Sequence, residues 1–185
     1  MINPGKVLFT TRSSLFQEPD IAHVAVDELT EAQALQLVRQ QAAARNLPEL
    51  ATAVDRELQP LYQSVGGNPL AIRLVVGLLH TFALADVLDD LASKQGAEIN
   101  QLYRFIYQKA WLGLNETARQ TLLAMLLTPE GGAPLPFLDH VNPALTPDNL
   151  RTALNHLVQV SLVERRGDLH MARYAIHNLT RTFLH

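Results

Sequence analysis

The sequence predicts a mainly α-helical protein that ends in a winged helix. From Thr30 onward, capped segments place apolar residues at the three- and four-residue spacing of amphipathic helices. From Asn115 onward the chain then runs helix, helix, helix and β-hairpin, which is the element order of a winged helix. Before Thr30, by contrast, two short apolar runs have the composition of strands.

The composition of the chain excludes several classes of function. The chain has 185 residues, of which 48% are hydrophobic and 18% charged, so it can build one large core or two small ones. A net charge of -3 provides no global positive field for nucleic acid or an anionic membrane. Cysteine is absent, which excludes disulfides and thiolate metal sites. Without a signal peptide or a run of about 20 apolar residues, we expect a cytoplasmic protein that does not enter a membrane.

The two candidate strands are Lys6–Thr11 and Ile21–Val26. A buried strand needs neighbours on both edges, and the residues ahead of Lys6 are too few to supply them. We therefore expect the sequence to begin inside a larger fold.

The middle of the chain has the pattern of a helical bundle. Thr30 can cap a helix that ends near Asn46, and Pro48 opens a second helix that continues to Leu61, with a bend at Pro60. Further helices are expected over Pro69–Leu79, Asp86–Ser93 and Ile99–Leu112.

The last third supplies the winged-helix pattern. Asn115 can cap a helix that runs through Leu126, and a Gly-Gly-Ala-Pro segment then breaks the chain. Expected after the break are helices over Pro136–Val141 and Pro147–Val158, strands over Ser161–Arg165 and His170–Ile176, and a short helix from Asn178.

Three separated motifs have residue types suited to binding a nucleotide. The first strand ends in TTR at Arg12, where a guanidinium at the carboxyl end of a strand can pair with a phosphate. The motif GNPLAI begins at Gly67, where glycine permits close approach and the ring of Pro69 can pack against an adenine. The motif IHNL places His177 between a strand and a short helix.

In this order the motifs resemble the back part of the NB-ARC nucleotide-binding module, the ATPase core of the STAND class of signalling switches. The resemblance covers nearly the whole chain. It implies that residues 1–29 are the end of an α/β P-loop domain, residues 30–112 a helical lid and residues 113–185 a winged helix.

The resemblance also implies roles for particular residues. Arg12 corresponds to the sensor arginine, while Gly67, Pro69 and Leu70 belong to the motif that contacts the nucleotide. His177 corresponds to the histidine that reaches the diphosphate of ADP and ties the winged helix to it. The family's Met-His-Asp triplet is Ile-His-Asn here, so Asn178 can cap a helix but brings no negative charge.

One part of the family pattern does not occur in the sequence. The phosphate loop G-x-x-x-x-G-K-[ST] is missing, since the one Gly-Lys pair, at Gly5, is followed by Val7. The resemblance places this loop and the magnesium site before Met1. It implies a regulatory, nucleotide-sensing part of an ADP/ATP switch that is not catalytic alone. Its expected partners are the missing P-loop half, the effector domains and other copies of itself.

An alternative is a winged-helix transcription regulator that reads DNA. The helix Pro147–Val158 would enter the major groove, with Arg165 and Arg166 in a wing at the hairpin tip. That helix carries one arginine and one aspartate, a poor footprint for phosphates, so nucleic acid is the less favoured partner. A hydrolase is disfavoured more strongly, because no nucleophile elbow or metal-ligand spacing occurs and the adjacent Asp89 and Asp90 point in different directions.

Overall fold

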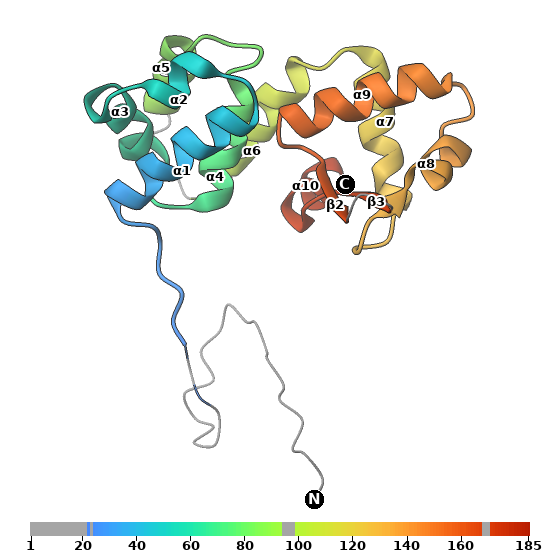
Figure 1. Cartoon of the computed structure of the whole chain (residues 1–185), viewed down its shortest axis with the longest axis horizontal. Helices are drawn as coiled ribbons and strands as arrows, with labels where there is room; N and C mark the ends of the chain where they lie inside the picture. The colour runs from blue at the N-terminus through green and yellow to red at the C-terminus, as the bar shows by residue number, and fades with distance from the viewer. Residues whose placement is uncertain (1–21, 23, 94–98, 168–170) are drawn as a thin grey trace, which may run out of the picture.

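The computed structural model describes Ala22 and residues 24–93, 99–167 and 171–185. Over these residues the protein is mainly helical with a small antiparallel sheet, which confirms the predicted fold class. Figure 1 shows the helices in two groups side by side, with α1–α6 in one and α7–α10 with the sheet in the other. No helix in the described ranges is both long enough and apolar enough to span a membrane.

The first group is built around α4. Its helices are α1 Glu31–Ala44, α2 Pro48–Thr52, α3 Asp55–Val65, α4 Pro69–Leu78, α5 Leu84–Ala92 and α6 Ile99–Leu112. From Ala71 to Leu78 every residue of α4 except Arg73 is buried. A helix that is apolar on nearly all sides belongs in a core, and α1, α3 and α6 pack around it.

The start and end of α1 confirm the predicted local signals. The Thr30 hydroxyl accepts a hydrogen bond from the Gln33 N–H at 3.5 Å, and Gln33 Oε1 accepts one from the Thr30 N–H at 3.0 Å. This reciprocal capping box satisfies two amide donors that the first turn leaves free. After the last turn, Asn46 takes a left-handed conformation with φ 58°, which asparagine tolerates better than most residues.

The prediction of one helix from Pro48 to Leu61 is wrong. The chain is extended at Ala53 and Val54, which separates α2 from α3. Arg39 of α1 stabilises this break, because its Nε donates to the Ala53 carbonyl at 3.0 Å and its Nη2 pairs with Asp55. A contact from another helix thus overrides the continuous helical pattern, whereas α3 itself continues past Pro60.

The second group has the element order of a winged helix. Its elements are α7 Glu116–Ala124, the 3-10 turn η1 Met125–Leu127, β1 Ala133–Pro134, α8 Leu135–Val141, α9 Pro147–Gln159, β2 Glu164–Gly167, β3 Ala172–Ala175 and α10 Asn178–Leu184. The antiparallel sheet has the order β1-β3-β2, with Ala133 opposite Tyr174 and Arg165 opposite Tyr174 on the other edge. Strand β1 was not predicted, because two residues after a Gly-Gly break carry no alternation.

The hairpin strands are shorter than expected. Ser161 has a left-handed φ of 63°, which no strand residue adopts, so β2 begins at Glu164. The return strand begins at Ala172, and the predicted start at His170 lies outside the described residues.

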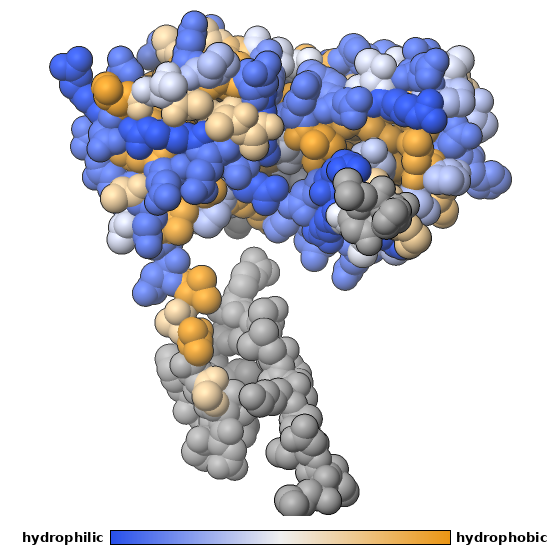
Figure 2. Space-filling model, viewed as in Figure 1, coloured by the Kyte–Doolittle hydropathy of each residue, from blue (hydrophilic) through white to orange (hydrophobic). Residues whose placement is uncertain are grey.

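The predicted strand Ile21–Val26 is wrong for the part that the structure describes. Ala22 and residues 24–26 form no strand, and the side chains of Val24 and Val26 are 85% and 93% exposed. Figure 2 shows apolar side chains uncovered on the segment that leads to α1. Within the described ranges this segment has no partner strand, so its backbone cannot form a ladder. Lys6–Thr11 and Arg12 lie outside the described residues.

Candidate functional site

The turn before α4 brings the first predicted motif into close contact with the segment before α1. The Leu29 N–H donates to the Gly67 carbonyl at 2.9 Å, and the Gly67 N–H donates to Glu28 Oε2 at 3.3 Å. A Cβ on Gly67 would lie 2.0 Å from the Leu29 carbonyl oxygen. Glycine is therefore required here for the approach of the protein's own backbone, and its amide is already bonded.

Beyond the turn, Asn68 caps α4 and leaves Pro69 on the surface. Asn68 Oδ1 accepts hydrogen bonds from the Leu70 and Ala71 N–H groups at 3.0 and 3.2 Å. The side chain of Leu70 is half-buried against the core, while Pro69 is exposed. Of the predicted binding residues in this motif, Pro69 is the one whose side chain is free to meet a ligand.

His177 lies immediately before a helix of the second group, as Asn68 does in the first group. It is the N-cap of α10, and its Nδ1 accepts a hydrogen bond from the Leu179 N–H at 3.2 Å. The cap is thus the histidine itself, whereas we expected that Asn178 could fill this role. With Nδ1 acting as an acceptor, the neutral ring carries its proton on Nε2, which can donate to a ligand.

Two tyrosines of α6 connect these two helix starts. Tyr103 Oη donates to Asn68 Oδ1 at 2.7 Å, and one turn later Tyr107 Oη accepts from Thr180 Oγ1 of α10 at 3.1 Å. Tyr107 also stacks on Phe183, with ring centroids 5.3 Å apart. Burial, with a smaller contribution from Tyr107, raises the pKa of Tyr103 to about 12, so its phenol remains a donor.

A cleft of about 440 Å³ separates the two groups on the side of α1, α4 and β2. Ser161 joins the groups beside this cleft, because its Oγ donates to the Arg73 carbonyl at 2.8 Å and accepts from Arg45 Nη2 at 2.8 Å. Arg45 Nε also donates to the Gln159 carbonyl at 3.1 Å. Gly77 allows α4 to approach the end of α9, since a Cβ there would lie 2.4 Å from the Val160 carbonyl oxygen.

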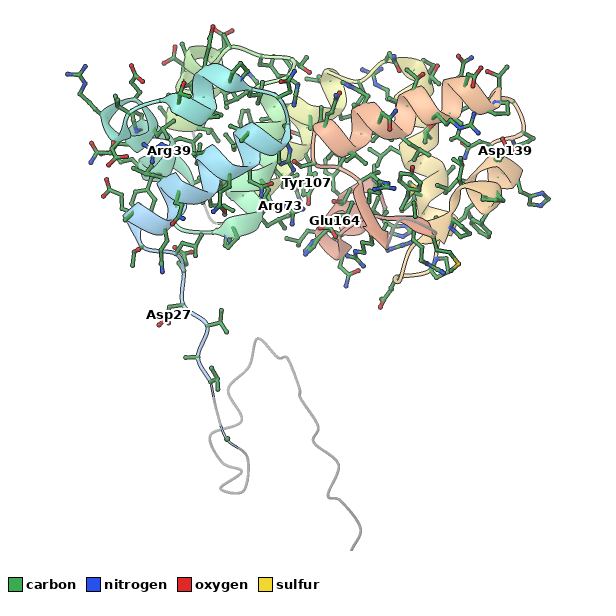
Figure 3. The ribbon with its side chains drawn as sticks, in the orientation of Figure 1. Asp27, Arg39, Arg73, Tyr107, Asp139 and Glu164 are labelled. Atoms are coloured by element: carbon green, nitrogen blue, oxygen red, sulfur yellow. The ribbon has the colours of Figure 1, made fainter. Side chains whose placement is uncertain are left out.

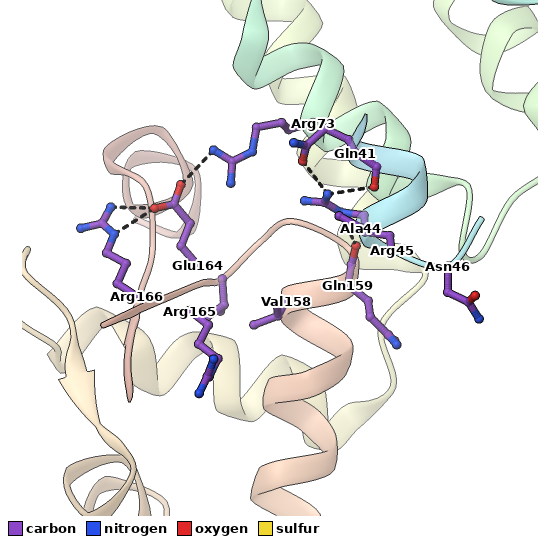
Figure 4. A pocket seen from close by; sticks show the side chains of 11 residues that line it. Gln41, Ala44, Arg45, Asn46, Arg73, Val158, Gln159, Glu164, Arg165 and Arg166 are labelled. Carbon is purple, nitrogen blue, oxygen red and sulfur yellow. Dashed lines mark hydrogen bonds and ion pairs between the residues drawn. The ribbon is translucent and has the colours of Figure 1, made fainter. Parts of the chain in front are cut away.

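Glu164 lies at the side of this cleft, between the two groups (Figure 4). Its carboxylate pairs with Arg73 Nη1 at 3.4 Å and with Arg166 Nη2 at 2.7 Å. Burial raises the pKa of Glu164, but the hydrogen bond from Arg166 and the charges of Arg166, Arg73 and His177 outweigh it, so the pKa is lowered.

The structure supplies residues that sequence reasoning missed. Arg73, Tyr107 and Glu164 lie at the junction of the two groups, as Figure 3 shows. They come from helices and a strand far apart in the chain, and no local pattern marks an arginine or tyrosine as a partner of a distant residue. Of the predicted site residues, Gly67, Pro69 and Leu70 share one turn, and His177 is linked to that turn through α6.

Comparison of the sequence with protein-family models and with curated proteins returns no match. Within the part of the chain that the structure describes, no group of histidine, aspartate and glutamate side chains is arranged to hold a metal ion.

Proposed function

We propose that this chain is the nucleotide-sensing part of a signalling switch of the NB-ARC type, made of a helical lid and a winged helix. The observation that carries the proposal is the double contact of α6. Tyr103 bonds to Asn68 beside Pro69, and Tyr107 bonds to Thr180 in the helix that His177 caps. Helix α6 thus connects the surroundings of Pro69 with those of His177. A ligand that contacts both residues would therefore influence how the two groups are held together.

The two side chains offer complementary chemistry. The exposed ring of Pro69 is an apolar surface against which a base can pack, and Nε2 of His177 can donate a hydrogen bond to a phosphate oxygen. In the complete switch, ADP would hold the helical and winged-helix groups together, and exchange for ATP would release them for assembly. A cytoplasmic location, and partners that comprise a P-loop half, effector domains and further copies of the chain, belong to the same proposal.

The missing phosphate loop sets the expected affinity. Its amides and lysine supply most of the grip on the phosphates of a nucleotide, and the sequence contains no such loop. We therefore expect this chain alone to bind ADP in the millimolar range and to hydrolyse no ATP.

Amide NMR during a titration with ADP tests the proposal. The expected result is a set of shifts at Gly67, Leu70 and Leu179 that disappears in Pro69→Ala or His177→Asn. Both replacements keep a residue suited to its helix position, since alanine is tolerated at the first turn and asparagine is a good N-cap. Absence of these shifts at millimolar ADP, or submicromolar affinity from calorimetry, would contradict the proposal.

The DNA-binding alternative is supported by the exposed polar residues of α9, including Asn149, Thr152 and Asn155. Its phosphate contacts are weaker, because Arg151 is paired with Asp148 and Arg166 with Glu164. If this chain retards random duplex DNA in a gel, and the retardation weakens as salt rises, the DNA-binding hypothesis would be favoured over the nucleotide switch.

A further inference from the structure

The cleft between the two groups gathers positive charge in a protein whose net charge is -3. Arg45 and Arg73 line it from the first group, and Arg165 and Arg166 line it from the second. Glu164 is the one carboxylate among its lining residues. Figure 4 shows these side chains around the cleft, contributed by α1, α4 and β2.

The single carboxylate does not balance the arginines. Glu164 is shared by Arg73 and Arg166, while Arg45 donates to neutral acceptors only, namely Gln41, Gln159 and Ser161. In the described part of the chain the guanidinium of Arg165 has no hydrogen-bond or ion-pair partner, and Nε of Arg73 is buried without an acceptor. The cleft thus holds more guanidinium donors than the protein supplies acceptors for.

The positive charges of the arginines in the cleft also repel one another. Burial and, after it, the charge of Arg73 lower the pKa of Arg45. Like charges in a recess repel, and a bound anion would relieve that repulsion and satisfy the spare donors. Guanidinium groups suit phosphate in particular, because their planar donors match its oxygens in pairs.

We propose that this arginine cleft binds a phosphate group of a small polyanion and that the anion joins the two groups. The recess between the groups admits a small ligand more readily than a duplex, whose phosphates lie on a convex surface. Glu164 occupies part of the cationic site, so it competes with the ligand for Arg73 and Arg166. The inference rests on the cleft alone and does not require the nucleotide contacts proposed above.

Inorganic pyrophosphate is the probe for this site. Titrated into the whole chain, it is expected to shift the amides of Arg45, Ser161 and Arg165, with an affinity that falls as salt rises. Arg165→Gln is expected to weaken binding about fivefold to tenfold, since one charge-assisted contact is lost. Because the side chain of Arg165 is exposed and has no partner among the described residues, this variant is expected to keep the fold.

Glu164→Gln is expected to change the affinity for pyrophosphate in the opposite direction to Arg165→Gln. Removing the competing carboxylate is expected to tighten pyrophosphate binding by a few-fold, although it removes the ion pairs with Arg73 and Arg166. Arg151→Gln is the matched control, because Arg151 is also an exposed arginine of the second group but is paired with Asp148 on α9. The control is expected to bind pyrophosphate as the wild type does.

Three outcomes would overturn the proposal: no binding of pyrophosphate, an equal loss in Arg151→Gln and Arg165→Gln, or unchanged or weaker binding in Glu164→Gln. ADP distinguishes the sources of the phosphate. Competition of ADP with pyrophosphate at the cleft amides assigns the site to nucleotide phosphates, and absence of competition assigns it to a separate anion. Adenosine, which lacks phosphate, tests the Pro69 contact independently of the cleft.

Discussion

Among the contacts between the two groups of helices, two differ clearly in chemistry. Where α6 meets α10, the contact is neutral and aromatic, made by Tyr107, Thr180 and Phe183. Where α1 and α4 meet the start of β2, the contact is cationic, made by Arg45, Arg73 and Glu164 around Ser161. Gly77 of α4 comes close to Val160, next to Ser161 at the cationic contact.

The difference indicates a division of roles. Buried hydrogen bonds between hydroxyl groups respond little to salt or to pH near neutrality, and the pKa of Tyr107 is raised by burial. An arginine-rich cleft responds to salt, to anions and to the protonation of its carboxylate. We therefore expect the aromatic contact to hold the groups together and the cationic contact to adjust how firmly they are held.

The largest effect is expected from Gly77→Ala, which would push α4 away from the end of α9 next to the cationic contact. The added Cβ would meet the Val160 carbonyl oxygen at 2.4 Å, where backbone must shift. We expect a loss of about 2 kcal/mol in the free energy of unfolding by urea, even though alanine favours helices. Gly131→Ala is the control, since a Cβ there meets nothing within 4 Å. Equal stability of the two variants would show that the approach at Gly77 is not needed.

The aromatic contact is tested by Tyr107→Phe. This change leaves Thr180, which is 1% exposed, without its hydrogen-bond partner, and a buried unpaired hydroxyl costs about 1–3 kcal/mol. Tyr103→Phe should cost less, because Asn68 Oδ1 keeps its two amide donors. Urea unfolding ranks the two against Tyr62→Phe, a tyrosine whose hydroxyl makes no hydrogen bond within the described residues. If Tyr103→Phe were the more destabilising of the two changes, the stronger hydrogen bond would be the one between Tyr103 and Asn68 at the start of α4.

For the cationic contact, Ser161→Ala removes one hydrogen bond to Arg73 and one from Arg45. We expect a loss of about 1 kcal/mol, because each partner can recover water at the half-buried cleft. Ser64→Ala is matched to it, since the Ser64 hydroxyl bonds only to the carbonyl of Pro60 in its own helix. Such a bond contributes little to helix stability. If both variants unfold at the same urea concentration, Ser161 does not join the groups.

The smallest effect is expected from pH acting on Glu164. Its pKa in the folded protein is lower than the ordinary value of 4.5, so the unfolded chain binds more protons in that range. The carboxylate thus stabilises the fold above pH 4.5, and this contribution is lost as pH falls through the folded pKa. We expect the stability difference between wild type and Glu164→Gln, about 1 kcal/mol or less, to vanish in acid. A difference that persists or grows there would contradict the assignment.

Much of the local structure follows from short-range signals. Thr30 and Asn115 cap helices as predicted, because a side-chain oxygen at the N-cap bonds to amides two or three residues away. Pro48, Pro69 and Pro147 each stand at the first position of a helix, where proline loses no hydrogen bond. These interactions lie within one turn, so the sequence contains both partners side by side.

The failures of prediction occur where a distant residue decides. Arg39 takes the Ala53 carbonyl and breaks an expected helix, and Ser161 bends out of an expected strand because Arg45 and Arg73 hold its hydroxyl. Strand β1 exists because β3 lies beside it. In each case the stabilising interaction is made with a partner more than a dozen residues away. The periodicity of a local segment contains no information about such a partner.

The candidate site divides in the same way. Local patterns are enough to predict that a glycine-containing turn precedes Pro69 and that His177 stands before a final helix. The folded chain is needed to bring Tyr103 and Tyr107 to those two places and to gather arginines from two groups in one cleft. Hydrogen bonds and charges act through space at a few ångströms, so contacts between residues distant in the chain exist only once the chain has folded.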